Sequence, residues 1–388
     1  MKQTLLCNKM RDMSKISLTR IVVTLLLSVG AFMEVRADYE IVKVDGNTYC
    51  IFPTTHTATI TSSAYHLGDM EFRDYKGYQV DEFVIPDSIE YEGEVYAVTA
   101  IGERAFSNSC LGRLVIPPTV KTIDPFAFGK CKMPRLDIPS TVTLLRFRVF
   151  ANCMIDSVIL PSRMGSLVIE EKLFWGDDPH TYVNYVRLPK DMTSIPPCMF
   201  KCTELADGVE IPETVTSIGD MAFDESNLSR ITLPANLEEL GIQAFGWCNN
   251  LKSITLPKGI KKIPSRLFSE TRLDTLRLLS LTPPWAVSRA SSDNLFYNYV
   301  SSYDEVWSNL PILIVPNGTK EQYQSTIPWK SFPKIYEESE VTAIKDIRVN
   351  GSIEMGYYSL DGRKLKSPQR GLNIIRQSDG STRKVIVK

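Results

Sequence analysis

The sequence predicts a β-rich α/β solenoid, in which short coils of chain stack and share one elongated core. Two periodic features predict this fold. One is a short apolar segment that usually ends in proline. The other is a phenylalanine that returns at intervals of 22 to 26 residues, at Phe106, Phe128, Phe150, Phe174, Phe200, Phe223, Phe245 and Phe268. A period in the twenties held over many copies indicates a stacked repeat architecture and not one closed domain.

The apolar segments have the apolar–x–apolar spacing of short strands, whose middle residue points away from the core. The proline-terminated copies lie at residues 114–117, 136–139, 158–161, 186–189, 209–212, 231–234 and 254–257. Residues 276–278 form a further copy without the proline. Because proline cannot donate to a strand ladder, it ends each strand. Stacked coils then build a parallel sheet along one face.

The chain between strand and phenylalanine carries a second apolar pair, such as Val215 and Ile218, followed by a compact turn. In residues 101–106 and 218–223, apolar side chains four residues apart predict one tight helical turn. Gly102, Gly219 and Gly241 are expected to relieve the backbone where the chain bends.

The ends of a solenoid expose core and need caps. Alternating strand signals over residues 38–91 predict a small N-terminal β cap, and residues 92–340 form the solenoid with its terminal coil. The aromatic residues from Trp285 to Trp307 are expected to seal the far end of the core, and an exposed recognition surface is the alternative. Residues 341–388 read as a separate C-terminal β module, because strand signals there flank two Asp-Gly turns.

The cysteines follow the same register. Cys110, Cys131, Cys153, Cys202 and Cys248 lie two to four residues after a phenylalanine. Metal sites usually show local C-x-x-C or histidine spacing, which is absent. We therefore predict a ladder of buried thiols that fills one core slot per coil. Neighbouring rungs such as Cys131 and Cys153 lie close enough to leave a disulfide open.

The run I-G-x-x-A-F, then C, then L-x-x-I-x-L-P, seen at residues 218–234 and 240–257, resembles the BspA-type leucine-rich repeats. The resemblance covers roughly residues 92–336. It implies a right-handed leucine-rich-repeat solenoid and a bacterial surface or secreted protein, in a Bacteroidetes family whose members include adhesins. The copies around Phe150, Phe174 and Phe200 lack I-G-x-x-A-F. The repeat motif has no catalytic residues to carry over.

The C-terminal module is similar to the sorting domains of Bacteroidetes secreted proteins, through Tyr358-Ser359-Leu360-Asp361-Gly362-Arg363 and the last strand, Lys384 to Lys388. That resemblance implies a role in export. A plain β module without such a role is the alternative.

The N-terminus has the plan of a signal peptide, with a basic start, an apolar run over residues 21–33 and small residues before a cleavage point after Ala37. We assign residues 1–37 to it, so the protein is expected to be exported, to the cell surface, the medium or the periplasm, without a later transmembrane segment. The net charge of −1 gives no global attraction to nucleic acid.

Two groups of residues are candidates for ligand binding. The interval between Pro161 and Pro189 is longer than its neighbours, and the extra chain holds Trp175, Asp177, Asp178 and Tyr182, which suit a sugar ring or a cation. The alternative is a slack loop.

The second group lies at outward strand positions, where arginines outnumber carboxylates: Arg113, Arg135, Arg187, Arg230 and Arg277. Arg113 and Arg135 are expected to be direct neighbours on adjacent strands. Guanidinium groups suit carboxylate, sulfate or phosphate, so an anionic glycan or acidic protein segment is the hypothesis. An ordinary solvated strand face is the alternative.

These features favour a non-catalytic, adhesin-like binding protein without a cofactor, whose partner is a protein or a glycan. The sequence has no nucleophile elbow, phosphate loop or metal-ligand spacing, which disfavours an enzyme. A structural envelope component without a soluble ligand remains the alternative.

Overall fold

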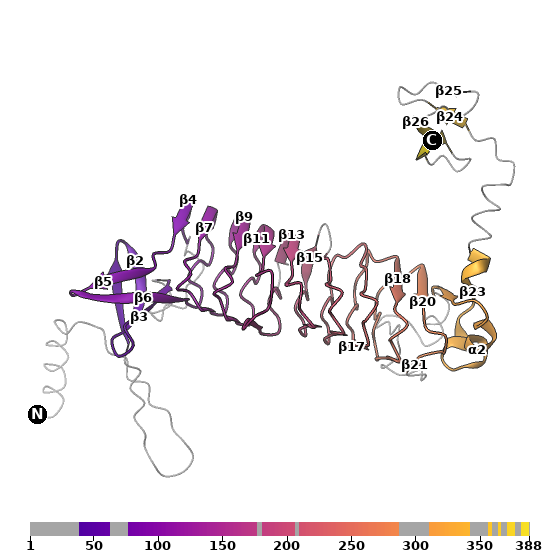
Figure 1. The fold of residues 1–388 in the computed structure, drawn as a ribbon, viewed down its shortest axis with the longest axis horizontal. Coiled ribbons are helices and arrows are strands. Elements are labelled where there is room, and N and C mark those ends of the chain that lie inside the picture. Colours follow the sequence, from indigo (N-terminus) through magenta and orange to yellow (C-terminus); the bar gives the residue numbers. More distant parts are fainter. Residues whose placement is uncertain are drawn as a thin grey trace, which may run out of the picture.

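The computed structural model describes residues 39–62, 77–176, 181–205, 209–286 and 310–341, and the backbone of four later strands. It confirms the predicted fold class, since the chain forms a β-rich repeat solenoid with parallel sheets (Figure 1). The expected signal peptide at residues 1–37 lies outside the described residues. Within the described ranges, no helix has the length and apolar character needed to cross a membrane.

Antiparallel strands form the beginning of the described chain, as the alternating pattern predicts. They are β1 (Glu40–Val44), β2 (Asn47–Phe52), β3 (Thr57–Thr61), β5 (Ser88–Tyr91) and β6 (Glu94–Ile101). β3 pairs in parallel with β6, which in turn starts the repeat ladder by pairing in parallel with β8. This is how an antiparallel cap passes into a parallel solenoid.

The first proline-terminated segments, together with β15, form a six-stranded parallel sheet, which we call the larger sheet because the other sheet of such segments has four strands. In spatial order its strands are β4 (Gln79–Val84), β7 (Cys110–Val115), β9 (Lys132–Asp137), β11 (Met154–Ile159), β13 (Thr181–Arg187) and β15 (Thr203–Leu205). A second parallel sheet contains β18 (Ser253–Leu256), β20 (Thr275–Leu278), β22 (Ile312–Val315) and β23 (Ile335–Glu337).

Between these two sheets the strand prediction is wrong for two coils. Residues 209–212 and 231–234 form no strand, and the single bridge Val186↔Val209 joins the first of them to β13. Ile211 and Leu233 are nevertheless buried. The apolar–x–apolar pattern therefore reports which side chains enter the core, but not whether the neighbouring backbone lies within hydrogen-bonding distance.

The second apolar pair of each coil forms a further column of two-residue parallel strands, which the sequence did not predict. The column contains β8 (Thr122–Ile123), β10 (Leu144–Leu145), β12 (Val168–Ile169), β14 (Ser194–Ile195), β16 (Ser217–Ile218), β17 (Glu239–Leu240), β19 (Lys262–Ile263) and β21 (Trp285–Ala286). It continues through the coils where the larger sheet is interrupted. The solenoid is thus held together along two edges.

The turn that carries each phenylalanine is not the helical turn predicted. Residues two before and two after the phenylalanines adopt left-handed backbone, for example Met221 (φ 52°) and Glu225 (φ 57°) around Phe223. This reversal aims the amide of Phe223 at the next coil, where it donates to the carbonyl of Ala244 at 2.9 Å. Hydrogen bonds between coils therefore alternate with bonds inside the turn, such as the one from the Asp224 amide to the Met221 carbonyl at 3.2 Å.

The glycines also serve a different purpose from the one expected. Gly219 and Gly241 lack a positive φ. A Cβ on Gly219 would lie 2.6 Å from the backbone nitrogen of Pro197, and one on Gly241 would collide with the backbone of Asp220. Glycine is needed here because adjacent coils approach closely, and not because the chain bends.

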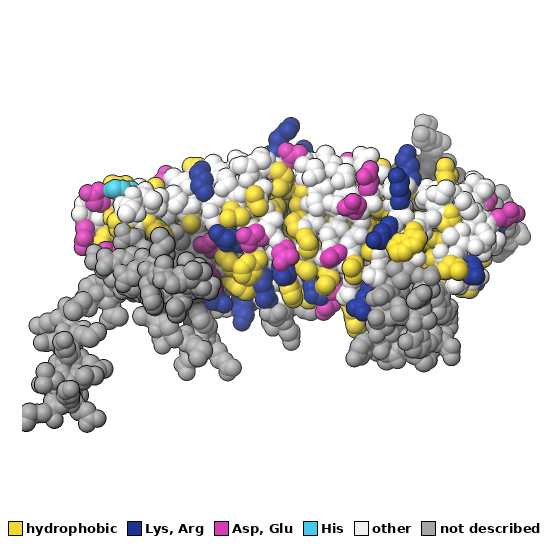
Figure 2. All heavy atoms as spheres, turned by 90° about the horizontal axis from the view of Figure 1, so that it is seen from below, with side chains coloured by type: hydrophobic (Ala, Val, Ile, Leu, Met, Phe, Trp, Pro, Cys, Tyr) yellow, Lys and Arg dark blue, Asp and Glu magenta, His cyan; other side chains and the backbone are white. Residues whose placement is uncertain are grey.

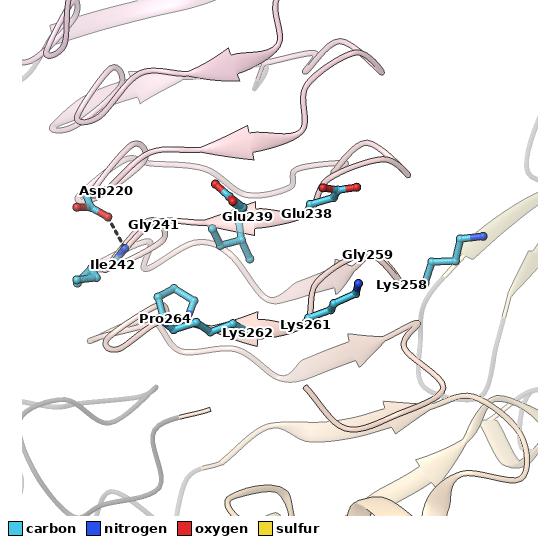
Figure 3. A pocket seen from close by; sticks show the side chains of 11 residues that line it. Asp220, Glu238, Glu239, Gly241, Ile242, Lys258, Gly259, Lys261, Lys262 and Pro264 are labelled. Atoms are coloured by element: carbon cyan, nitrogen blue, oxygen red, sulfur yellow. Dashed lines mark hydrogen bonds between the residues drawn. The ribbon is translucent and has the colours of Figure 1, made fainter. Parts of the chain in front are cut away.

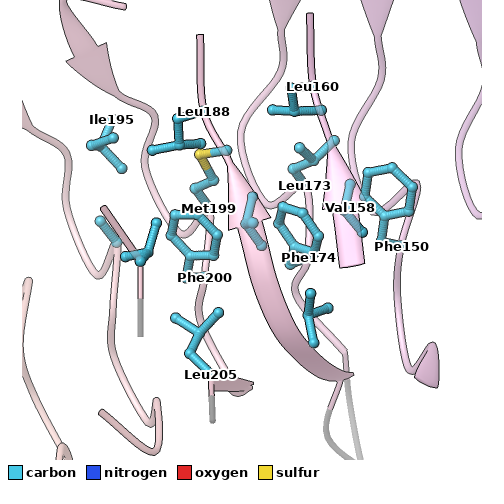
Figure 4. Packing of buried hydrophobic residues seen from close by; sticks show 14 of the residues in the cluster. Phe150, Val158, Leu160, Leu173, Phe174, Leu188, Ile195, Met199, Phe200 and Leu205 are labelled. Atoms are coloured by element: carbon cyan, nitrogen blue, oxygen red, sulfur yellow. The ribbon is translucent and has the colours of Figure 1, made fainter. Parts of the chain in front are cut away.

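The phenylalanines form one continuous stack in the core, which Figure 4 shows at Phe150, Phe174 and Phe200. Neighbouring ring centroids are 4.9 to 6.1 Å apart and the ring planes are 5° to 25° from parallel. All eight rings are fully buried. The 22- to 26-residue period is therefore the spacing between layers of this stack.

The cysteine ladder is part of a wider column that accepts serine, threonine or cysteine. Its members are all buried: Ser109, Cys131, Cys153, Thr181, Thr203, Ser226, Cys248 and Thr271. Four of them, Thr181, Thr203, Cys248 and Thr271, donate to a phenylalanine carbonyl of the preceding coil, as when Cys248 Sγ lies 3.1 Å from the Phe223 oxygen. The slot thus selects a small side chain that can donate to that carbonyl.

Two cysteines expected in the ladder lie beside this column. Cys110 follows the slot residue Ser109 and is exposed, and Cys202 precedes Thr203. In these two coils the buried position is the third residue after the phenylalanine, and each cysteine lies one residue away from it. The sequence alone does not show which of the adjacent positions enters the core. Cys131 and Cys153 are free thiols, so the disulfide left open for them is not formed.

We expect Thr271→Val to destabilise the protein by about 1–3 kcal/mol. The Thr271 hydroxyl donates to the Phe245 carbonyl at 2.6 Å and accepts from the Cys248 amide at 3.0 Å, and valine leaves both buried groups unpaired. Thr271→Ser keeps both bonds and is the matched control. Urea unfolding followed by circular dichroism measures the difference, and equal midpoints for the two variants would contradict the assigned role of the hydroxyl.

The far end of the solenoid is closed by a terminal coil with α2 (Lys320–Ser325) and η4 (Trp329–Ser331). Tyr323 and Trp329 are fully buried, and they donate to the carbonyls of Ser280 and Pro284 at 2.8 Å each. Trp285, expected to seal the core, is instead 61% exposed, because β21 directs it outward. Phe296 to Trp307 lie outside the described residues.

The C-terminal module contains antiparallel strands, as its Asp-Gly turns predict. They are β24 (Gly356–Tyr358), β25 (Lys364–Leu365), β26 (Gly371–Arg376) and β27 (Thr382–Val387). β26 and β27 form the predicted hairpin across Asp379-Gly380.

Candidate binding surfaces

The outward residues of the larger sheet form regular columns across the strands. Glu82 of β4 lies opposite Arg113 of β7, and Ser157 of β11 lies opposite both Arg135 of β9 and Tyr185 of β13. Cys110 of β7 is paired in register with Lys132 of β9, and these residues lie three positions before Arg113 and Arg135, respectively. Arg113 and Arg135 therefore belong to the same column, as predicted.

Carboxylates neutralise most of the arginines proposed to bind an anion. Arg113 donates to Glu82 at 2.9 Å. Arg135 places two nitrogens on Asp137, each at 2.7 Å, and this bond lowers the pKa of Asp137 below its usual value. These pairs are exposed, so they add little stability. They do, however, occupy the guanidinium groups that the sequence suggested for binding an anionic ligand.

The remaining arginines are spread over different surroundings. Arg277 of β20 contacts both carboxylate oxygens of Glu338, at 2.7 and 2.6 Å. Arg230 is exposed and precedes residues 231–234, the proline-terminated segment that forms no strand. Arg187 donates to the backbone carbonyl of Leu160 at 3.2 Å. Figure 2, which views one face, shows acidic and basic side chains interspersed there.

A hollow of about 410 Å³ marks the place where the larger sheet is interrupted. Its walls are the end of β13 and residues 210–213. Tyr185 and Arg187 project from β13, while Glu210 and Glu213 face them from the next coil. The ladder between β13 and β15 ends at Val183↔Leu205, and beyond it the described residues form one further bridge, Val186↔Val209, so the hollow lies where the ladder stops. Tyr185 occupies an outward strand position, and nothing in the repeat pattern distinguishes it from the other outward residues.

The candidate site on the longer loop is only partly within the described residues. Asp177 and Asp178 lie outside them. Trp175 is half-buried, and the Arg148 guanidinium lies 5.1 Å from its ring and 5.2 Å from that of Phe126. Tyr182 donates to Asn184 at 2.6 Å. Trp175 is thus engaged with a neighbouring coil, and Tyr182 with a residue of its own strand.

The buried cysteines are poor candidates for chemistry. Burial raises the pKa of Cys131 and of Cys248 to about 12, so these thiols are protonated at neutral pH. Thiolate is the form that attacks substrates and binds metals. In the part of the chain that the structure describes, no three His, Cys, Asp or Glu side chains converge as a metal site would require.

A family comparison matches the repeat region. Residues 99–181 and 168–283 match the family described as BspA type leucine rich repeat region, with six copies. No curated protein matches the sequence.

Solved bacterial structures resemble this one at low identity. A leucine rich cell surface protein from Faecalibacterium prausnitzii A2-165 is 17% identical, with a TM-score of 0.40, over 78% of this chain and 97% of that one. The pneumococcal vaccine antigen PcpA is 13% identical, with a TM-score of 0.32, over 77% and 98%. A leucine-rich repeat protein from Bacteroides ovatus ATCC 8483 is 16% identical, with a TM-score of 0.31, over 77% and 88%. Similarity at this level says nothing about ligands.

Proposed function

Residues 99–283 match the BspA-type leucine-rich repeat family, and from this match we propose that the chain is an exported, adhesin-like protein that binds a protein partner without catalysis. In this proposal residues 1–37 direct export, residues 38–91 and the terminal coil cap the solenoid, and residues 341–388 act as a sorting module. The protein is then displayed at the cell surface or released.

The observation that carries the proposal is the hollow at the end of β13. Tyrosine and arginine are the residue types that most often dominate binding energy at protein interfaces. Here Tyr185, 37% exposed, and Arg187 stand beside a depression large enough to take a partner side chain. Glu210 and Glu213 add acceptors on the opposite wall. The ion-paired arginines elsewhere on the sheet fit a polar rim better than an anion site.

The proposal is tested on immobilised extracellular-matrix proteins and on intact host and bacterial cells, with the full chain as the probe. For a partner that binds, we expect Tyr185→Ala together with Arg187→Ala to weaken binding by at least about 2 kcal/mol, roughly thirtyfold. Arg113→Ala, which removes a paired arginine from the same sheet, is the matched control and should have little effect.

Two results would count against this function. The first is binding that is unchanged when Tyr185 and Arg187 are both replaced. The second is an exclusively periplasmic location in fractionated cells, which would favour a structural envelope component.

A further inference from the structure

A second and larger depression lies on another part of the solenoid, between the coils that contain β17 and β19. It encloses about 820 Å³. Glu238 and Glu239 line one wall, and Lys258, Lys261 and Lys262 line the other (Figure 3). We call it the lysine groove. It is independent of the hollow beside Tyr185.

Close backbone packing shapes the groove. Gly241 and Gly259 are among its lining residues, and a Cβ on either would collide with the preceding coil. The Asp220 carboxylate at one end accepts from the Ile242 amide at 2.7 Å, so it is already used. The depression of about 820 Å³ between the two charged walls offers room for a ligand.

The lysines of the groove differ from the arginines of the sheet in being available. No carboxylate of the described residues forms an ion pair with Lys258, Lys261 or Lys262. All three side chains are exposed. Three ammonium groups within five residues, none of them paired with a carboxylate of the described residues, equip one wall of the groove to bind carboxylate or sulfate.

An exposed indole flanks this wall. Trp285 of β21 is paired in register with Lys262 of β19, is 61% exposed, and its ring centroid lies 5.5 Å from the Lys262 ammonium. Trp285 thus presents a large aromatic surface to solvent beside the lysines, whereas the terminal coil buries Trp329. An indole face next to cations suits a ring that carries an acidic group.

The acidic wall narrows the choice of ligand. Glu238 and Glu239 would repel a polyanion of high charge density, such as nucleic acid. The same carboxylates are strong acceptors for hydroxyl groups. A ligand with one negative charge per ring and several free hydroxyls satisfies both walls at once.

We propose that the lysine groove binds an acidic polysaccharide built of uronic acid units. The lysines pair with the ring carboxylates, Glu238 and Glu239 accept from ring hydroxyls, and Trp285 stacks on one ring face. This goes beyond the protein partner proposed for the Tyr185 hollow, and it uses none of the same residues.

The test measures binding of the full chain to sodium polygalacturonate by calorimetry, with neutral dextran and dextran sulfate for comparison. We expect the order polygalacturonate, dextran sulfate, dextran, with affinity falling as salt rises. Replacing Lys258, Lys261 and Lys262 by glutamine should weaken binding about tenfold or more, the effect of losing three exposed ion pairs. Trp285→Ala should also weaken it.

A matched triple variant, Lys43→Gln, Lys132→Gln and Lys330→Gln, makes the same charge change on exposed lysines elsewhere. If both triple variants lose the same affinity for polygalacturonate, the loss is explained by net charge alone and the proposal is overturned. A preference for dextran sulfate that is indifferent to Trp285→Ala would overturn it too. Because Tyr185 and Arg187 remain intact in these variants, failure here leaves the test of the protein-binding site unaffected.

Discussion

Replacing Phe223 by alanine is expected to cost about 3–5 kcal/mol of stability, since it removes a fully buried ring from a packed core. The Phe223 ring lies between those of Phe200, at 5.2 Å, and Phe245, at 5.5 Å, so both neighbours lose a stacking partner. In a solenoid each coil contacts only its neighbours. The loss should therefore concentrate around the coils near residue 223, which hydrogen exchange measures directly.

Phe147→Ala provides the matched control, because it deletes the same side chain at a position that is 42% exposed. We expect it to cost less than about 1 kcal/mol in urea unfolding. If the two variants lose equal stability, or if exchange rises uniformly along the chain in Phe223→Ala, the stack does not couple the coils as described.

The period of the phenylalanines predicted the stacked coils because burial imposes a strict spacing on large apolar residues. One ring is required per layer, so a single residue type returns with each coil, and the fold class follows from that count. The apolar–x–apolar segments located the strands in the same way. Their failure at residues 209–212 and 231–234 has a physical reason, since those side chains are buried without a backbone ladder.

The candidate sites were less predictable, because they depend on contacts between coils. Glu82 neutralises Arg113 from β4, and Glu338 neutralises Arg277 from beyond the last strand of its sheet. Both carboxylates lie outside the repeat copies at residues 114–278 that define the outward positions. The three nearby lysines at residues 258–262 were visible in the sequence, but the groove beside them depends on how two glycine-containing coils pack.

A second large loss of stability is expected when Lys201 is replaced. Lys201 belongs to a buried charge pair that the repeat pattern does not predict. Its ammonium bonds to Asp224, which is fully buried, and to Glu225 at 2.9 Å. Burial alone would lower the pKa of Lys201, but the bonds to these carboxylates raise it above its usual value, so the ammonium stays charged. Asp224 also accepts from Gln243 at 3.0 Å.

Lys201→Met should cost about 3–5 kcal/mol at neutral pH, because it leaves a carboxylate buried without its cation. The double variant Lys201→Met with Asp224→Leu should recover most of the loss, since removing both charges also removes the uncompensated one. Unfolding by urea at pH 7 compares the three proteins. A double variant that is no more stable than the single one would show that the cost lies in packing and not in charge.

The pH dependence of Lys201→Met separates these causes further. Burial raises the pKa of Asp224, while the bond from Lys201 opposes that rise, so the variant should raise this pKa further. A carboxyl whose pKa is higher in the folded state contributes stability that is fully present below its unfolded value, about 4, and is lost as pH rises through the folded value. The deficit of Lys201→Met relative to wild type should therefore shrink at pH 4 and widen toward pH 8. A deficit that stays constant over this range would mean that Asp224 is not the group left uncompensated.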